Sequence, residues 1–254
     1  MLSVIILGGG KATRMGGICK DTPKEMLPFG GVPFLAYLVS HFVRLELGEI
    51  IIIRGHIGHV VEDYFGNERW RSQGVRTVEY LELAGTARAA KVGIEHAQYD
   101  RMFMCNADTV LGFDFARILS LYTSQNLPVM SFVTTQEGVQ NQGAVLVQKG
   151  VTKEFDEGKP SKPTWIRALV EGAEIRGSNV GCYFMDRAFA LGPEGIGTEL
   201  RFERETIPRW VADGKVAGSL MHQPAFFDFG TPERFAELQR RSEILETVYG
   251  KPMD

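Results

Sequence analysis

Cysteine is scarce in this sequence: only Cys19, Cys105 and Cys182 occur among 254 residues, and no two of them form a CxxC pair. An odd and scattered set argues against a disulfide framework and against a zinc site, so we expect reduced thiols. Cys105 and Cys182 lie inside apolar runs, which predicts burial. Cys19 lies in a polar loop and is expected to be more accessible.

A strong net charge and a long apolar segment are also missing. The formal net charge is −3 and the sequence pI is 6.0, which gives no general attraction to nucleic acid or to an anionic membrane. No segment approaches the ~20 apolar residues of a membrane span, and the first residues lack the features of a signal peptide. We therefore expect a cytoplasmic protein that binds small ligands, with neither nucleic acid nor membrane as a partner.

The first half of the chain alternates Val- and Ile-rich runs with segments of helical periodicity. This alternation is typical of an α/β fold, a three-layer, doubly wound and mostly parallel Rossmann-like sheet with helices on both faces. The predicted strands cover 2–7, 49–55, 75–83, 101–108 and 129–135, and the predicted helices cover 33–47, 59–65, 85–97 and 113–125.

The pattern changes after residue 135, where short strand-like pieces are broken by Gly, Pro and Lys rather than by long helices. These pieces, at 143–148, 151–157, 178–185 and 216–223, predict an inserted small β layer. A final helix is predicted over 231–250, because Thr, Pro and Glu open it. No linker-like stretch separates these parts, so we expect a single domain, 1–254, made of 1–135, 136–230 and a C-terminal segment 231–254.

A glycine-rich loop follows the first predicted strand directly, with Gly8, Gly9 and Gly10 at the carboxyl end of the strand, where such sheets bind ligands. The loop is not a GxGxxG motif, since Thr13 replaces the third glycine, and it lacks the Gly-Lys-Ser/Thr of a P-loop. The cations Arg14 and Lys24 follow it. Bare backbone beside two cations predicts a polyphosphate site.

Seven segments resemble, in order, the motifs of the sugar-1-phosphate nucleotidyltransferases, and most closely the short bacterial heptose-1-phosphate guanylyltransferase branch. They are GGGKATRM (8–15), PKEMLPFGG (23–31), LAGTARA (83–89), CNADTV (105–110), FDEGKP (155–160), SNVGCYFM (178–185) and FDFGTPE (227–233). The resemblance implies a GT-A-like nucleotidyltransferase fold in which 1–135 binds the nucleotide and 136–230 the sugar.

The resemblance also implies a role for each matching residue. Arg14 and Lys24 would act in catalysis, and Asp108 and Asp228 would bind Mg²⁺, a cation that prefers hard carboxylate oxygens. The nucleotide would be bound by Leu7, Gly8, Gly9, Gly10, Thr13, Gly85 and Thr86. The sugar phosphate would be bound by Asn106, Gly143, Lys159, Asn179 and Gly181.

Several positions depart from the family pattern. Ala12 and Ala107 stand where the family has glycine, Arg88 replaces the second glycine of its element, and Gly158 splits the Glu-Lys pair, so that Glu157 is not assigned. If residue 12 requires a positive φ, its methyl group costs about 1 kcal/mol. Each carboxylate also has a structural alternative, because Asp108 and Asp228 could cap the segments that follow them.

The expected reaction joins a nucleoside triphosphate and a sugar 1-phosphate into an NDP-sugar and pyrophosphate, with GTP and a heptose- or mannose-like phosphate favoured. UTP, CTP or dTTP with another sugar or cyclitol phosphate is the near alternative. A glycosyltransferase is a second enzyme hypothesis, although NADTV is not its DxD motif. A non-catalytic nucleotide-binding regulatory subunit is the alternative from another class, and a homodimer is left open.

Overall fold

The computed structural model describes residues 1–81, 85–134, 143–148, 151–160, 174–220 and 225–253. For 143–148, 153–160, 174–176, 220 and 225 only the backbone is described. None of the described helices is long and apolar enough to cross a membrane.

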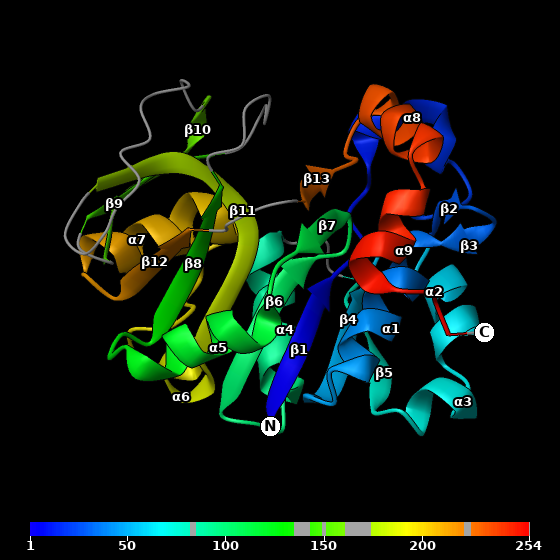
Figure 1. Cartoon of the computed structure of the whole chain (residues 1–254). Helices are drawn as coiled ribbons and strands as arrows, with labels where there is room; N and C mark the ends of the chain where they lie inside the picture. The colour runs from blue at the N-terminus through cyan, green and yellow to red at the C-terminus, as the bar shows by residue number, and fades with distance from the viewer. Residues whose placement is uncertain (82–84, 135–142, 149–150, 161–173, 221–224, 254) are drawn as a thin grey trace.

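A nine-stranded sheet in the order β5-β4-β1-β6-β11-β8-β12-β10-β9 forms the centre of the molecule (Figure 1). Strands β5, β4, β1 and β6 are parallel neighbours, and within the described part of this sheet only β10 and β11 run in the opposite direction. The strands are β1 Leu2–Leu7, β4 Gly48–Arg54, β5 Val75–Glu79, β6 Arg101–Asn106, β8 Val129–Thr134, β9 Gly143–Gln148, β10 Val151–Pro160, β11 Glu174–Asp186 and β12 Val216–Leu220.

Helices cover both faces of this sheet. They are α1 Phe34–Arg44, α2 His59–Phe65, α3 Glu68–Arg71, α4 Thr86–His96, α5 Phe115–Ser124, α6 Arg187–Leu191, α7 Ile207–Ala212, α8 Pro232–Arg240 and α9 Glu243–Tyr249, with short turns η1 Thr13–Cys19, η2 Lys24–Met26 and η3 Phe202–Thr206. Alternate residues of β1 enter different cores, because side chains on a strand point to opposite faces. Val4 and Ile6 pack with α1, α5 and α9, whereas Ile5 packs with α4, α6 and α7.

The predicted fold class is confirmed, and the structure shows how its second half is attached. Strands β8, β9, β10, β11 and β12 extend the same sheet beyond β6. The small separate sheets are β7 Thr109–Gly112 with β13 Ala225–Asp228, and β2 Pro28–Phe29 with β3 Val32–Pro33. The pairing of β7 with β13 joins segments that are far apart in the sequence.

Several details differ from the predictions; the strand expected over 75–83, for example, ends at Glu79. The helix expected over 231–250 breaks at Arg241, whose φ of −127° and ψ of 30° are not helical, so α9 takes its own direction. That direction brings Tyr249 under β7, where its hydroxyl accepts from Leu111 N at 2.7 Å. Cys19 was expected to be accessible but is only 8% exposed, because η1 folds its side chain into the core beside Met15. Cys105 and Cys182 are buried as predicted.

Candidate active site

The glycine loop crosses the end of β4 at backbone contact distance. Gly8 N donates to Ile53 O at 2.9 Å, and Gly9 O accepts from His56 N at 3.0 Å. Gly9 has a φ of +80°, and a Cβ there would lie 2.1 Å from Gly55 N. Position 9 therefore accepts only glycine, which lets the loop pass close to the backbone at the end of β4. The next residue, Gly10, is exposed.

Ala12 takes the left-handed conformation, with a φ of 46° and a ψ of 35°. The positive φ considered from the sequence is therefore present, and an alanine there is strained by about 1 kcal/mol. Its carbonyl accepts from Met15 N at 2.8 Å, which starts the turn that carries Arg14. Ala107, the other glycine replacement, is buried and keeps a φ that is not positive.

Lys24 and Asp108 form an ion pair in which Lys24 Nζ donates to Asp108 Oδ2. Each side chain is 18% exposed. Burial alone would raise the pKa of Asp108, but the charge and hydrogen bond of Lys24 hold that pKa below its usual value. Burial by itself would lower the pKa of Lys24. The charge and hydrogen bond of Asp108 outweigh the effect of burial, so the pKa of Lys24 is raised. Both groups are therefore charged near neutral pH.

Glu25 belongs to the site although sequence reasoning did not select it. Its side chain is 3% exposed, and its Oε1 accepts from Gly9 N at 2.8 Å. A Cβ at Gly8 would lie 2.7 Å from the same oxygen, so the carboxyl group is packed directly beneath the loop. Burial raises the pKa of Glu25. A single charged residue next to Lys24 gives no periodic signal of burial, which is why the pattern missed it.

A pocket of about 1080 Å³, measured with its open mouth, lies above these groups. Most of the predicted site residues line it: Leu7, Gly8, Gly9, Gly10, Arg14, Lys24, Gly85, Thr86, Asn106 and Asp108. Lys11, Ala12, Glu25, Tyr80, Ala89 and Ala107 complete the lining. Thr13 is exposed on η1 and is not in contact with the pocket.

The far wall of the pocket is the beginning of α4. Gly85 has a φ of +100°, and a Cβ there would lie 1.9 Å from Leu200 O. Thr86 Oγ1 accepts from Phe202 N at 2.9 Å and donates to Glu203 Oε2 at 3.2 Å. These contacts fix the start of α4 against η3. Glu203, whose pKa is raised by burial, is a second carboxyl group near the pocket that the sequence did not indicate.

Asn179 and Gly181 form an irregularity in β11 beside the pocket. Gly181 has a φ of +73°, and a Cβ there would lie 2.5 Å from Nδ2 of Asn106. Asn179 is 1% exposed, donates from Nδ2 to Tyr183 Oη at 2.9 Å and accepts from Gly181 N at 3.1 Å. Its amide group therefore holds the bulge and does not line the pocket. Gly143 begins β9 and Lys159 lies on β10, but their side chains are outside the described residues.

Asp228 is brought to Asp108 by the β7–β13 pairing. Asp228 is opposite Thr109 in the register, and Phe229 N donates to Asp108 O at 3.3 Å. Thr231, not Asp228, caps α8, since Thr231 Oγ1 accepts from Arg234 N. The described residues contain no cluster of three or more His, Cys, Asp and Glu side chains placed to hold a metal. Two carboxylates on adjacent backbone segments nevertheless fit Mg²⁺, which keeps several waters or substrate oxygens as ligands.

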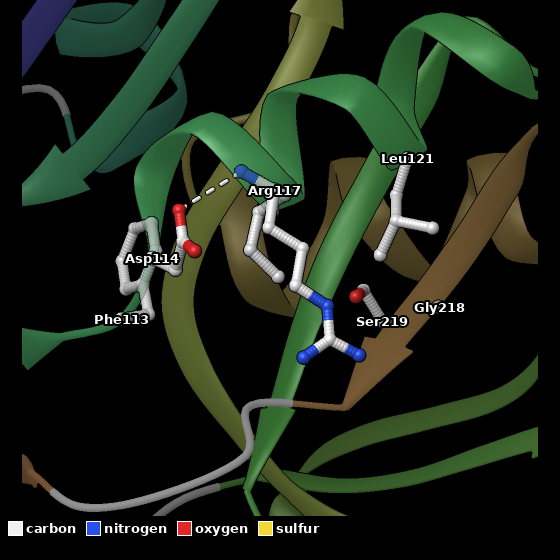
Figure 2. Close-up of a pocket in the computed structure, with 7 residues that line it drawn as sticks. Phe113, Asp114, Arg117, Leu121, Gly218 and Ser219 are labelled. Carbon is white, nitrogen blue, oxygen red and sulfur yellow. Dashed lines mark hydrogen bonds between the residues drawn. The ribbon is translucent and has the colours of Figure 1, made fainter.

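A second pocket, of about 620 Å³, lies between α5 and β12 (Figure 2). Arg117 extends across it toward Gly218 and Ser219, and Asp114 accepts from Arg117 N at 3.0 Å as the cap of α5. None of the residues assigned to the reaction lines this pocket.

Comparisons with known proteins show which family the chain belongs to. Residues 3–243 match the family described as nucleotidyl transferase. The chain is 27% identical over 239 residues to mannose-1-phosphate guanylyltransferase of Mycobacterium tuberculosis, covering 92% of this chain but only 62% of that protein. It is 22% identical to D-glycero-alpha-D-manno-heptose 1-phosphate guanylyltransferase of Aneurinibacillus thermoaerophilus, covering 94% of this chain and 97% of that protein.

The fold is also similar to solved structures. HddC from Yersinia pseudotuberculosis, complexed with GMP-PN, superposes with a TM-score of 0.73 at 19% identity, covering 95% of this chain and all of that chain. A second structure of HddC from the same organism gives a TM-score of 0.71. The similarity of the structures concerns the fold, whereas the family match covers nearly the whole sequence. The chain therefore belongs to the nucleotidyl transferase family.

Proposed function

We propose that this protein transfers a nucleotidyl group from a nucleoside triphosphate to a sugar 1-phosphate, forming an NDP-sugar and pyrophosphate. The observation that carries the proposal is the Lys24–Asp108 pair at the base of a pocket bounded by the glycine loop. A bare backbone loop, two cations and neighbouring carboxylates are the groups that phosphoryl chemistry needs.

The triphosphate binds along the loop. The exposed backbone of Gly10 and the residues after it offers N–H groups to phosphate oxygens, while Gly9 N is already bound by Glu25. Arg14, exposed on η1, supplies a bidentate cation for the outer phosphates. Lys24 neutralises charge that develops at the α-phosphorus. Gly85 and Thr86 at the start of α4 close the opposite side, toward the base.

Asp108 and Asp228 would hold the Mg²⁺ ion. When bound, the ion neutralises phosphate charge and orients the reacting phosphates. Before the ion binds, each carboxylate has a cationic partner, Lys24 for Asp108 and Arg234 for Asp228.

The sugar phosphate supplies its own nucleophile. One of its oxygens attacks the α-phosphorus in line, the new P–O bond forms as the bond to the β-phosphate oxygen breaks, and pyrophosphate leaves. The attacking phosphate is already ionised at neutral pH, so the protein needs no general base. Its contribution is positioning and charge stabilisation. We assign the sugar side to Asn106, which lines the pocket, and to Gly181, which packs against Asn106.

GTP and a heptose- or mannose-like 1-phosphate are the substrates we favour. The relatives named above as guanylyltransferases for mannose and heptose phosphates support this choice. A UTP-, CTP- or dTTP-dependent enzyme is the alternative within the class. The retained cations and carboxylates count against a non-catalytic subunit. We also assign a cytoplasmic location, consistent with three buried free thiols, and keep the homodimer as a prediction.

Pyrophosphate release tests the proposal. The purified protein is assayed with Mg²⁺ and each nucleoside triphosphate, paired with the 1-phosphates of mannose, glucose and a manno-heptose. Release that needs GTP together with the mannose or heptose phosphate is the expected result. Release with another pair would correct the substrates, and nucleotide binding without release from any pair would favour the regulatory alternative.

A further inference from the structure

Asp228, the proposed metal ligand on β13, contacts Gly230 and Arg234. Its Oδ1 accepts from Gly230 N at 3.3 Å, and its Oδ2 lies 3.3 Å from Nη1 of Arg234. The side chains of the Arg234–Asp228 pair are 20% and 15% exposed. The pair is therefore shielded from solvent screening more than a surface ion pair.

The start of α8 determines where Arg234 lies. Thr231 caps the helix, Pro232 is its first residue, and the chain then turns back over the end of β13. The guanidinium carbon of Arg234 lies 4.6 Å from the centroid of the Phe227 ring, close enough for a cation–π contact. From the first turn of α8, Arg234 therefore contacts both the ring of Phe227 and the carboxylate of Asp228.

The hydrogen bonding of Arg234 is incomplete. Its Nε is buried and has no hydrogen-bond partner among the described atoms. A guanidinium group has five N–H donors, and a buried donor that stays unpaired lowers stability. Arg234 is therefore held here by the charge of Asp228 and the ring of Phe227, without the full set of bonds that would fix it.

We propose that Arg234 is a positioning residue that competes with a divalent metal ion for Asp228. The inference rests on the proposed function, because that function makes Asp228 a metal ligand. A hard divalent cation and a guanidinium group cannot use the same carboxylate oxygen without repulsion. A divalent ion held at Oδ2 would therefore displace Arg234, and the phosphate groups of the substrates are the anions that would then receive its charge.

Manganese binding to the protein alone tests this competition. The free Mn²⁺ signal in electron paramagnetic resonance is measured for the wild type, Arg234→Gln, Asp228→Asn and the double variant. Removing a partly shielded competitor is expected to tighten Mn²⁺ binding about threefold to tenfold. Arg241→Gln is the matched control, because Arg241 forms a more exposed pair with Glu237 next to the same helix, and it should bind like the wild type.

The double variant decides whether the gain acts through Asp228. We expect it to bind Mn²⁺ as weakly as Asp228→Asn. Equal affinity of Arg234→Gln and the wild type, or a gain that survives in the double variant, overturns the proposal. Arg234→Lys keeps the charge and should lie between the wild type and the glutamine variant, which provides the same reading if Arg234→Gln does not fold. The measurement needs neither nucleotide nor sugar phosphate, so it stays valid if the proposed reaction is wrong.

Discussion

Lys24 and Asp108 are 84 positions apart in the sequence, yet the lysine ammonium group donates directly to the aspartate carboxylate. The pair places a proposed catalytic cation on a proposed metal ligand, so each group keeps the other charged before substrates bind. When substrate and metal bind, Lys24 has to exchange Asp108 for a phosphate group, and Asp108 has to exchange Lys24 for the metal ion. The first predictions concern this pair.

Asp108→Asn should lower turnover at least about 100-fold, the scale on which a preorganised charge at the reacting phosphate acts. The amide keeps the shape of the side chain but loses the charge that would bind the metal. Steady-state pyrophosphate release at saturating Mg²⁺ measures the effect. Asp63→Asn, an exposed carboxylate on α2, is the control. Wild-type turnover in a folded Asp108→Asn protein would remove Asp108 from the metal site.

The same pair predicts a pH dependence of stability. The pKa of Asp108 is lowered in the folded protein, so its contribution to stability is complete above the unfolded pKa of about 3.9 and is lost as the pH falls through the folded pKa. In Lys24→Met the cationic partner is gone, and burial raises the pKa of Asp108. The charged carboxylate then destabilises the folded protein, and this cost is lost when Asp108 is protonated. The stability difference between wild type and variant, from urea denaturation between pH 6 and pH 3, should shrink on acidification. A difference independent of pH would contradict this.

Ala12→Gly should leave the free energy of unfolding unchanged or raise it by up to about 1 kcal/mol, because glycine removes the strain of the positive φ and adds freedom to the unfolded chain. At an ordinary helical site the same change destabilises. Ala236→Gly, at an exposed position within α8, is the control and should lose about 0.5–1 kcal/mol. Equal losses in both variants would show that the left-handed turn is not strained.

Glu25→Ala should raise the KM for the nucleoside triphosphate about tenfold or more, since Gly9 N would lose its buried acceptor, and an unpaired buried donor costs about 1–3 kcal/mol. Glu25→Gln keeps an acceptor for Gly9 N and should stay within about threefold of the wild type on the same reasoning. The KM for the sugar phosphate should not change in either variant. Equal KM values for the triphosphate in the alanine and glutamine variants would show that the bond to Gly9 is not what matters.

Gly85→Ala should lower the melting temperature by several degrees and weaken nucleotide binding, because its Cβ would collide with Leu200 O in a backbone region with φ of +100°. The start of α4 would have to move away from η3 to make room for the added Cβ. Gly10→Ala is the control for stability, since a Cβ there meets nothing within 4 Å. Calorimetry of both variants measures the difference, and similar melting temperatures would contradict the prediction.

The sequence was sufficient for the main strands and helices of the first half and for the position of the glycine loop, but it did not indicate short elements such as α6, α7 and β7. The boundaries of β1 and α2 were predicted to the residue, because apolar periodicity over a buried strand or helix is a local property. The family glycine at position 12 raised the question of a positive φ there, and the structure shows that Ala12 has one. The break at Arg241 was missed because both halves of the predicted helix carry good helical periodicity.

The sequence by itself therefore determined the strand and helix pattern, the glycine loop at the carboxyl end of β1 and the identity of the charged groups. Only the tertiary structure decided which of those groups meet. The β7–β13 pairing sets Asp228 beside Asp108, Glu25 is turned beneath Gly9, and α8 returns Arg234 onto Asp228. These contacts join residues distant in the chain, and their geometry depends on the packing of whole elements, which no local pattern of residues records.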